Sequence, residues 1–308
     1  MNKKKDTIAI LMGGLSDERN ISILTGKACC KALIKKGYKI NKIDPKDNLL
    51  YELKKTKPKK VFNALHGRYG EDGFVQNILE YLKIPYTHSG VLASTLAMDK
   101  VLSKIIFIKN NFLVPKYILL ENVSKNEISK KLKTKNIKFP TVIKPTNEGS
   151  SLGVYICKNL SELYKNYKKL RNYKKVIVEQ YIPGREIQVA VKGNKALGAI
   201  ELVPKRKFYD YKAKYSTRAN TKHIMPAPIN KKKYNEVLLI AKKAHKVLGC
   251  KGITRSDFRF YKNKFYLLEL NTQPGMTNLS LVPEIALNQG IKFEELIDWM
   301  IKDASLNR

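Results

Sequence analysis

The sequence ITRSDFRFYKNKFYLLELNTQPGMTNL occupies residues 253–279 and carries the strongest structural pattern in the chain. Two runs rich in aromatic and aliphatic residues flank the polar triplet 262–264, in which Asn263 can adopt a left-handed conformation. The pattern predicts a β-hairpin whose loop consists of these three residues. In that register Tyr261 faces Phe265.

This register places two carboxylates, Asp257 and Glu269, directly opposite each other, and Arg255 opposite Asn271. Like charges at opposed positions destabilise a sheet by roughly 0.2–1 kcal/mol, so we expect a positive group between them. Carboxylate and amide oxygens are ligands that Mg²⁺ prefers, together with substrate phosphates. The residues alone also allow a surface hairpin whose charges face water.

The composition describes a globular protein of about two domains. Hydrophobic residues make up 43% and charged residues 28% of the 308 positions, which is typical of a folded chain. No apolar run approaches the roughly 20 residues needed to span a membrane, and the N-terminal segment lacks a small-residue cleavage site. The cysteines lack metal or redox spacing; they are Cys29, Cys30, Cys157 and Cys250. We therefore expect a cytoplasmic protein with reduced thiols and no membrane partner.

The net charge of +34 raises the question of a nucleic-acid partner. Lys far outnumbers Arg among the 60 basic residues, and the Lys are spread along the whole chain. Proteins that recognise nucleic acids concentrate their basic groups and use Arg for bidentate contacts. We therefore expect no specific nucleic-acid binding, and only weak, salt-sensitive attraction to polyanions.

The first hundred residues predict an open parallel α/β sheet. The apolar run 6–14 predicts a buried strand that ends at a glycine pair, followed by a helix capped by Ser16 or Asp17. Further strands are predicted at 38–43, 61–65 and 84–86, and helices at 21–33, 49–53, 74–83 and 92–107. Ligands collect at the carboxyl ends of such strands, where the glycine-rich loop 66–73 places His66.

A second unit contains a loop suited to phosphate. Prolines make 114–117 and 139–145 extended, and a Lys-rich surface helix is predicted between them at 124–135. Lys144 is followed by the small-residue loop 146–153, which can present backbone N–H groups and hydroxyls to a phosphate. The loop lacks the Gly-Lys-Ser/Thr ending of a Walker A motif. A simple hairpin turn between the two flanking strands remains an alternative.

The remainder of the chain predicts strands, a lid and helices. Strands are predicted at 176–182 and 187–192, and helices at 230–248 and 280–304. Between the strand at 187–192 and the helix at 230–248, residues 208–215 contain too many aromatic side chains for a loop without a function. Residues 216–228 are predicted to be irregular chain. A long ordered loop with aromatic residues is usually a lid or a binding loop.

Motifs along the whole chain closely resemble, in order, those of one enzyme family. They are Gly-Gly-x-Ser-x-Glu at 13–18, His-Gly-x-x-Gly-Glu-Asp-Gly at 66–73, Met-Asp-Lys at 98–100, Lys-Pro at 144–145 with Glu-Gly-Ser-Ser-Leu-Gly at 148–153, Phe-Tyr-Asp-Tyr-Lys-Ala-Lys-Tyr at 208–215, Arg-Ser-Asp at 255–257, and Glu-Leu-Asn-Thr-Gln-Pro-Gly-Met-Thr at 269–277. The set resembles the D-alanine–D-alanine ligases, which are ATP-grasp enzymes of peptidoglycan precursor synthesis. Two departures touch no expected ligand: Asn20, where the family usually has an acidic residue, and Tyr69 within the second motif.

The resemblance implies an α/β fold of three modules. These are an N-terminal substrate-binding domain with an open parallel sheet at 1–97, a central ATP-grasp subdomain at 98–183, and a C-terminal ATP-grasp subdomain at 184–308 with the lid and a magnesium site. ATP would lie between the second and third modules. In this family ATP phosphorylates the carboxylate of one D-alanine, and the amine of a second D-alanine attacks the acyl phosphate, releasing ADP and phosphate. A homodimer formed through the N-terminal module is also implied.

The resemblance further implies which residues bind ATP and metal. Two Mg²⁺ or Mn²⁺ ions would be held by Asp257, Glu269 and Asn271. The residues expected to contact the nucleotide are Lys100, Lys144, Glu148, Ser150, Ser151, Glu179, Gln180, Tyr181, Ile182, Glu186 and Lys214. Of these, the first two lysines would meet the phosphates beneath the serine loop. Residues 179–182 would form the adenine edge, and Glu186 would bind the ribose.

For the two amino acids, the resemblance implies a site built from both ends of the chain. Glu18 would bind the ammonium of the first D-alanine and connect through Ser150 to Tyr215. Arg255, with backbone N–H groups near Gly275, would stabilise the oxyanion formed when the amine attacks. The remaining expected residues are Lys214 beside the transferring phosphoryl group, His66 near the first substrate, and Ser280 and Leu281 at the carboxylate of the second.

Tyr215 bears on the choice between related activities. Depsipeptide ligases that use D-lactate typically lack this tyrosine, so its presence favours an amino acid as the second substrate. The alternatives are another carboxylate ligase of the same fold and a nucleic-acid-binding protein. Release of phosphate from ATP that depends on D-alanine would separate these hypotheses.

Overall fold

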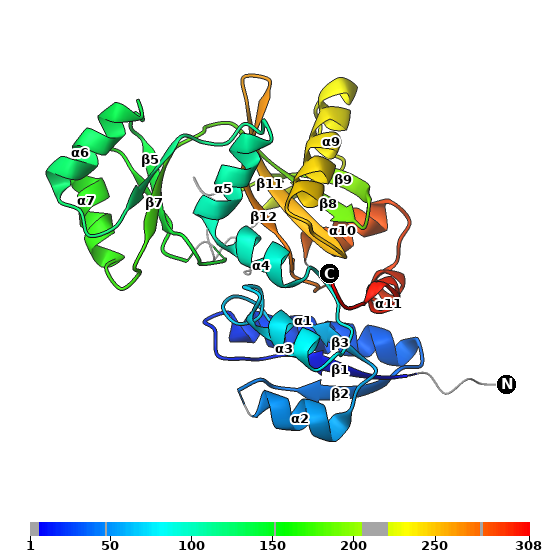
Figure 1. Cartoon of the computed structure of the whole chain (residues 1–308). Coiled ribbons are helices and arrows are strands. Elements are labelled where there is room, and N and C mark those ends of the chain that lie inside the picture. The colour runs from blue at the N-terminus through cyan, green and yellow to red at the C-terminus, as the bar shows by residue number, and fades with distance from the viewer. Residues whose placement is uncertain (1–5, 47, 151, 205–220, 278–279) are drawn as a thin grey trace.

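The fold is described from a computed structural model at residues 6–46, 48–150, 152–204, 221–277 and 280–308. Three β-sheets define three units, which we call N-terminal, central and C-terminal after the order of their strands in the chain. The central unit lies beside the C-terminal unit, with helix α5 (Lys100–Lys109) between them and the N-terminal unit below (Figure 1).

The N-terminal unit contains a parallel three-stranded sheet in the order β2-β1-β3. Its elements are β1 (Thr7–Leu11), α1 (Arg19–Lys35), β2 (Lys39–Ile43), α2 (Leu49–Thr56), β3 (Lys60–Asn63) and α3 (Phe74–Tyr81). Because side chains alternate along a strand, Ile8 and Ile10 pack with α1. Ala9 and Leu11 pack on the other face with α2 and α3. The predicted strand at 84–86 is only an isolated bridge at Tyr86.

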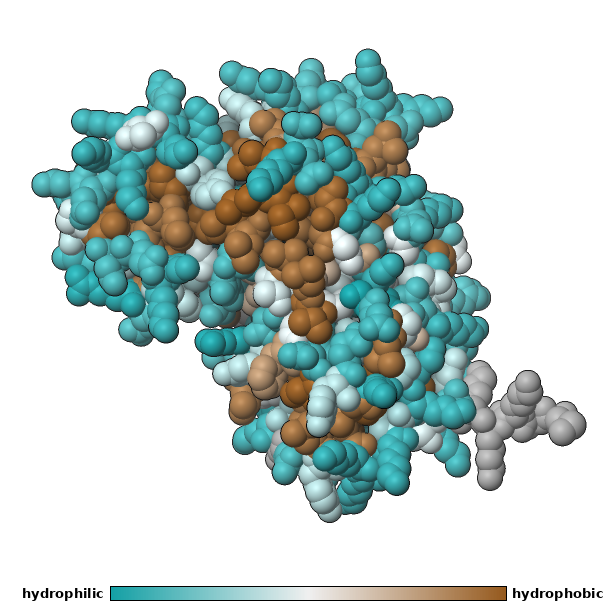
Figure 2. All heavy atoms as spheres, in the orientation of Figure 1, coloured by the Kyte–Doolittle hydropathy of each residue, from teal (hydrophilic) through white to brown (hydrophobic). Residues whose placement is uncertain are grey.

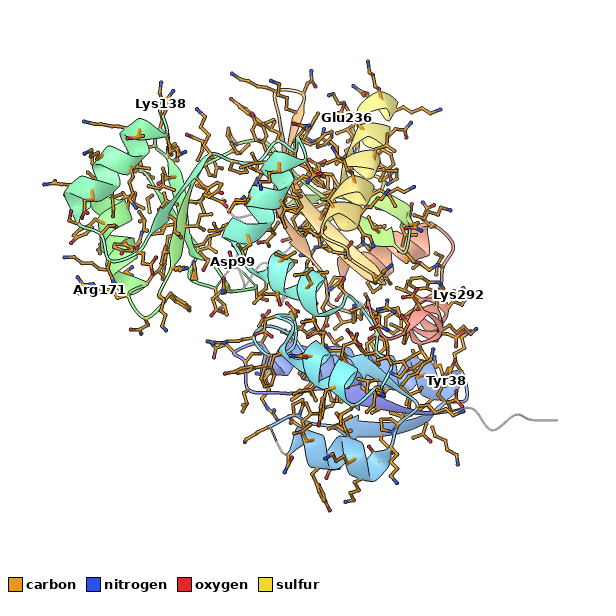
Figure 3. All side chains as sticks on the ribbon, in the orientation of Figure 1. Tyr38, Asp99, Lys138, Arg171, Glu236 and Lys292 are labelled. Atoms are coloured by element: carbon orange, nitrogen blue, oxygen red, sulfur yellow. The ribbon has the colours of Figure 1, made fainter. Side chains whose placement is uncertain are left out.

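The single helix predicted at 92–107 is two helices in the structure. The first, α4 (Val91–Met98), ends at Asp99, whose backbone is extended with φ −82° and ψ 107°. The Asp99 carboxylate then caps α5 by accepting hydrogen bonds from the N–H groups of Val101 and Leu102 at 2.8 and 3.0 Å. Figure 3 shows Asp99 where the two helices meet, on the side of the central unit. This break makes Lys100 the first residue of a new helix.

The central unit is an antiparallel four-stranded sheet in the order β4-β7-β5-β6. Its elements are β4 (Tyr117–Leu120), α6 (Lys125–Thr134), β5 (Thr141–Pro145), β6 (Tyr155–Cys157), α7 (Leu160–Lys169) and β7 (Val176–Gln180). Ile143 and Val178 lie on neighbouring strands and share a core with Leu132 of α6 and Leu163 of α7. The helices therefore cover the face of the sheet to which these two residues point.

The C-terminal unit is an antiparallel five-stranded sheet in the order β10-β9-β8-β11-β12. Its elements are β8 (Arg185–Lys192), β9 (Lys195–Val203), β10 (Lys222–Ile224), α9 (Lys231–Val247), β11 (Ile253–Tyr261), β12 (Lys264–Asn271), α10 (Leu281–Asn288) and α11 (Phe293–Asp303). Along β8, Val189 and Val191 pack with α9, whereas Ala190 packs with α10 and α11. The sequence pattern does not predict β9. Strand β10 lies within 216–228, so the prediction of irregular chain is wrong there.

One hydrophobic cluster joins the N-terminal and C-terminal units. It includes Ile8 and Leu33 from the first, and Ala190, Leu296 and Met300 from the second. The four cysteines are buried and free. Among the described residues, no helix has both the length and the apolar character that a membrane crossing requires.

The hairpin of β11 and β12 has a tighter turn than predicted. Its loop is two residues, Lys262 and Asn263, whose φ angles of 47° and 57° are both left-handed, as a type I′ turn requires. Tyr261 therefore pairs with Lys264, and the predicted pairing of Tyr261 with Phe265 is wrong.

A β-bulge nevertheless restores the predicted register at the far end of the hairpin. Phe258 pairs with Leu267, whereas Asp257 pairs with Glu269, so Leu268 is an extra residue in β12. The turn is one residue shorter than predicted and β12 has one extra residue, so their effects on the register cancel. Asp257 thus lies opposite Glu269 as predicted, and the same register sets Arg255 opposite Asn271.

Candidate active site

Two adjoining cavities lie where the three units meet. The larger, of about 650 Å³, is lined by α1, the loop after β3, the junction of α4 and α5, the loop after β5, and strands β8, β11 and β12. The smaller, of about 100 Å³, lies between the central and C-terminal sheets. Lys100, Glu148, Gly149 and Glu269 line both cavities, so they mark the junction of the two spaces.

Glu18 lies in the larger cavity and is the N-cap residue of α1. No side chain caps this helix, so the predicted caps Ser16 and Asp17 are wrong. The Ser150 hydroxyl, from the loop after β5, donates a short hydrogen bond to Oε1 of Glu18. The structure therefore brings together two residues that are 132 positions apart and belong to different units. The third predicted member of this network, Tyr215, lies outside the described residues, as do Ser151 and Lys214, which are predicted to contact the nucleotide.

Two glycines make room for the Glu18 carboxylate. A Cβ added to Gly67 would lie 2.7 Å from Oε2 of Glu18, and one added to Gly149 would lie 2.8 Å from the same atom. Gly67 also has a φ of 70°, which favours glycine. The loop after β3 and the loop after β5 can therefore approach this carboxylate only because neither carries a side chain there.

His66 is held through both nitrogens of its ring. Nδ1 lies 2.9 Å from Oε1 of Glu71, and Nε2 lies 3.0 Å from the hydroxyl of Thr25. When Glu71 is ionised and the imidazole is neutral, Nδ1 carries the proton, because a carboxylate can only accept, and Nε2 accepts from the Thr25 hydroxyl. Burial raises the pKa of Glu71, and the hydrogen bond from His66 offsets only part of this effect. The sequence does not single out these two partners, although Glu71 lies within the motif at 66–73.

The opposed carboxylates of the hairpin are close to two cations. Both nitrogens at one edge of the Arg255 guanidinium donate to Asp257, with Nε to Oδ1 at 2.8 Å and Nη2 to Oδ2 at 2.9 Å. Lys100 Nζ lies 3.8 Å from Oε2 of Glu269. The Asn271 side chain lies on the same face. The expectation of positive charge beside the two acids is therefore met by residues of the chain itself.

The donor set of Asp257, Glu269 and Asn271 also fits a metal ion shared with a phosphate. Its oxygens are hard ligands, and no His or Cys competes among them. In the part of the chain that the structure describes, no group of three or more His, Cys, Asp or Glu side chains is arranged to hold a metal. Two carboxylates and an amide would leave about half of the roughly six coordination sites of Mg²⁺ to phosphate oxygens and water.

The predicted phosphate loop is anchored by Lys100. This residue donates from Nζ to the Glu148 carbonyl at 2.6 Å, and its backbone N–H donates to the Thr146 carbonyl at 3.1 Å. Burial raises the pKa of the Glu148 carboxyl, while Lys100 acts to lower it. Strands β5 and β6 pair directly, so the loop is a hairpin connection and also lines both cavities.

Glu179, at the end of β7, is buried between two lysines. Its Oε2 lies 3.0 Å from Nζ of Lys144, and its Oε1 lies 3.0 Å from Nζ of Lys104. Burial acts to raise the pKa of Glu179, but the two lysines outweigh it and the pKa is lowered. For Lys144, burial acts in the opposite direction and Glu179 outweighs it, so that pKa is raised. Lys104 is absent from the predicted site; its spacing of four residues from Lys100 on one helix is the signal that could have indicated it.

The remaining predicted nucleotide residues line the smaller cavity. They are Gln180, Tyr181, Ile182 and Glu186. The Gln180 side chain is tied to the backbone of Lys138, accepting from its N–H at 3.0 Å and donating to its carbonyl at 3.1 Å. Glu186 forms an ion pair with Arg259 at 3.1 Å.

At the far end of the larger cavity lies the N-terminus of α10. Ser280 is its N-cap residue, and Leu281 is its first helical residue. The Ser280 hydroxyl accepts from the Thr277 N–H at 2.9 Å. A Cβ on Gly275 would lie 3.1 Å from the same oxygen. A helix N-terminus with a nearby hydroxyl attracts carboxylates, and the carboxylate of the second substrate stays a prediction for this position.

The smaller cavity is enclosed by an antiparallel sheet of four strands and another of five, and a parallel sheet completes the larger cavity. This arrangement defines an ATP-grasp fold. The family model described as the D-ala D-ala ligase C-terminus matches residues 107–302. A D-alanine–D-alanine ligase of Pelagibacter ubique is 58% identical over all of both chains, and one of Wolbachia pipientis is 49% identical over 97% of this chain and 94% of the relative.

Solved structures agree with these relatives. The D-alanine–D-alanine ligase of Bacillus anthracis aligns with a TM-score of 0.85 at 34% identity, over 97% of each chain. A structure of the Bacillus anthracis enzyme complexed with ATP aligns with a TM-score of 0.82 at 31% identity, over the same shares. The chain belongs to the D-alanine–D-alanine ligase family.

Proposed function

We propose that this chain is an ATP-dependent D-alanine–D-alanine ligase, which joins two D-alanines through an acyl phosphate and releases ADP and phosphate for peptidoglycan precursor synthesis. The observation that best supports this function is the junction of the two cavities. Glu18 and Ser150 meet in the larger one, and Lys144 and Glu269 line the smaller one, with Lys100 at the boundary. A substrate carboxylate and a terminal phosphate could meet there.

The nucleotide is proposed to occupy the smaller cavity, which lies between the central and C-terminal sheets. The use of ATP is supported by the Bacillus anthracis relative, whose structure is complexed with ATP. Gln180, Tyr181 and Ile182 would line the adenine and Glu186 would bind the ribose. Lys100 and Lys144 would meet the phosphates, with Glu148, Ser150, Ser151 and Lys214 closing over them. Phosphoryl transfer asks a protein mainly for such positioning and charge neutralisation.

Mg²⁺ or Mn²⁺, in two ions, would be held by Asp257, Glu269 and Asn271. Metal bound there would neutralise charge on the triphosphate. The opposed carboxylates reach this position because the bulge in β12 sets their register. Arg255 lies against Asp257, so its guanidinium is already beside the proposed phosphate site.

The first D-alanine is proposed to place its ammonium on Glu18, with Ser150 fixing the carboxylate of that residue. His66, held by its two partners, would form part of the wall beside this substrate. The Ser150 hydroxyl would continue the network to Tyr215. A carboxylate held in this way binds an ammonium through a charge-assisted hydrogen bond, which is stronger than a hydrogen bond between two neutral groups.

The second D-alanine is proposed to place its carboxylate at Ser280 and Leu281, where the N-terminus of α10 favours negative charge. Its amine would then face the acyl phosphate. Arg255 and backbone N–H groups near Gly275 would stabilise the oxyanion of the tetrahedral intermediate. Lys214 would neutralise the departing phosphate.

We also propose that the three modules are 1–97, 98–183 and 184–308, because each sheet falls within one of these ranges. The proposed reaction draws on ATP and D-alanine in the cytoplasm. A homodimer is proposed through the N-terminal module, with a contact surface that continues from α4 onto α5, where Figure 2 shows hydrophobic residues gathered. Leu92, Leu102, Ile105 and Ile108 on these helices are each at least 41% exposed.

The test is phosphate release from ATP with D-alanine, L-alanine, D-lactate or no acceptor, with Mg²⁺ withheld and then restored. We expect release only with D-alanine and metal, together with D-alanyl-D-alanine identified by mass. Release that does not depend on the acceptor, or a preference for D-lactate, would contradict the proposed function.

A further inference from the structure

Lys104 is a buried lysine that the proposed reaction does not use. It is 0% exposed, whereas the neighbouring lysine on the same helix, Lys109, is exposed. Burial of an ammonium group is costly unless the charge is paired. Such a residue is retained in a well-packed helix only when its partners compensate for that cost.

The two partners of Lys104 belong to different sheets. Its Nζ lies 3.0 Å from Oε1 of Glu179, at the end of β7 in the central unit. The same nitrogen donates to the carbonyl of Leu268, on β12 of the C-terminal unit, at 3.2 Å. Glu179 and Leu268 both line the smaller cavity, but Lys104 lines neither cavity. One ammonium group behind the cavity therefore connects its two walls.

The contact with Leu268 falls on the residue that sets the hairpin register. Leu268 is the extra residue of the bulge, and a bulge interrupts the hydrogen-bond ladder of its strand. Lys104 supplies a hydrogen bond to the carbonyl at that interruption. The bulge is what places Glu269 opposite Asp257, so Lys104 supports the geometry of the proposed metal site.

The contact with Glu179 affects the second lysine of the site. Lys104 takes one oxygen of the carboxylate and Lys144 takes the other. An ammonium group has three donors, so Lys144 keeps donors for a phosphate while it holds Glu179. The cluster carries two positive charges and one negative charge, and this excess favours an anionic ligand. Without Lys104 the excess disappears, and the carboxylate can move toward Lys144.

We propose that Lys104 is a positioning residue of the nucleotide site: it holds Glu179 with one contact and the β12 bulge with the other. It thereby sets the spacing of the two sheets that enclose the nucleotide. This inference rests on the proposed use of ATP. The proposal predicts that loss of Lys104 lowers the affinity for the nucleotide more than the affinity for D-alanine, because the proposed contacts of D-alanine lie in the larger cavity.

The test compares K104M, which keeps the length and apolar stem of the side chain, with K109M on the exposed face of the same helix. For each folded variant the measurements are ADP affinity by calorimetry, the KM for ATP and the KM for D-alanine. K104M should weaken ADP binding and raise the KM for ATP by about tenfold or more, with the KM for D-alanine within twofold. K109M should match the wild type. A wild type that binds ADP but lacks D-alanine-dependent turnover would refute the proposed function, whereas the calorimetric comparison of ADP affinity would still test the role of Lys104.

K104R supplies a second comparison, because it keeps the charge and the donors. We expect ADP affinity closer to wild type in K104R than in K104M. If K104M does not fold, K104Q takes its place, since a neutral polar group keeps a donor for Leu268 and removes the charge beside Glu179. ADP affinity within twofold of wild type in the neutral variant, or equal rises in KM for ATP and D-alanine, would overturn the proposal.

Discussion

Replacing Gly149 with alanine tests whether Glu18 must occupy its position in the larger cavity. The new Cβ would lie 2.8 Å from Oε2 of Glu18, and an ordinary contact begins at 3.4 Å, so the carboxylate must retreat by about 0.6 Å. Glu18 is a long side chain, and Gly149 does not have a left-handed φ, so neither backbone strain nor core damage follows. We therefore expect a loss of stability below about 1 kcal/mol.

The effect on catalysis should be much larger than the effect on folding. A misplacement of about 1 Å at a reacting centre can reduce the rate by about 100-fold. A shift of about 0.6 Å at the proposed ammonium site should therefore lower kcat/KM for D-alanine by about tenfold or more. Gly149 also lines the smaller cavity, but the three atoms nearest the added Cβ all belong to Glu18, so the affinity for ADP should change by less than twofold.

The assay is D-alanine-dependent phosphate release at saturating ATP, with thermal unfolding and ADP calorimetry on the same protein. G198A is the matched control, because its Cβ would meet the Met225 methyl group at 2.7 Å and neither residue lines a cavity. Both variants crowd the end of a flexible side chain, but only G149A crowds Glu18. Normal kcat/KM in G149A, or an equal loss in G198A, would refute this account of the site.

Three further predictions follow from other parts of the molecule. E269Q should abolish turnover and metal-dependent ADP binding with an unchanged unfolding temperature; near-normal activity would rule out the proposed ligand role. Burial lowers the pKa of His245 to about 4, so the unfolded chain binds a proton below about pH 6.5 that the folded chain does not bind until about pH 4. Through this window His245 should contribute a loss of at most about 1.4 kcal/mol of unfolding free energy per pH unit, so H245Q should lose less stability than the wild type; equal slopes in denaturant titrations would contradict this. In analytical ultracentrifugation, I105K should sediment as a monomer and the wild type as the proposed dimer. A wild type that sediments as a monomer would contradict the proposed interface.

The strands and helices with strong local patterns are predictable because their hydrophobic periods and end signals are read from neighbouring residues. The helix predicted at 230–248, for example, is α9 at Lys231–Val247, and Asn230 is its N-cap residue, since that side chain accepts from the N–H three residues on. The sequence pattern does not predict strand β9, and it predicts one continuous helix across Asp99. In the second case the flanking residues all favour helix, so the pattern does not reveal that the Asp99 carboxylate caps a new helix.

The hairpin shows where local reasoning reaches its limit. The opposition of Asp257 and Glu269 is correct, although the predicted loop is one residue too long and the bulge at Leu268 compensates for it. The bulge carbonyl accepts from Lys104, a residue 164 positions earlier in the chain. No local pattern contains that contact, so sequence periodicity could not predict the bulge.

The sequence by itself determined which residue types the site would contain: acids on a hairpin, lysines beside a small-residue loop, and a glutamate after the first strand. Only the tertiary structure decided which of them meet. It placed Glu179 between two lysines, and it joined Glu18 to Ser150, a contact that the family resemblance implied but no local pattern contained. The physical reason is that side-chain chemistry is local to a residue, whereas the pairing of buried charges depends on how whole sheets pack together.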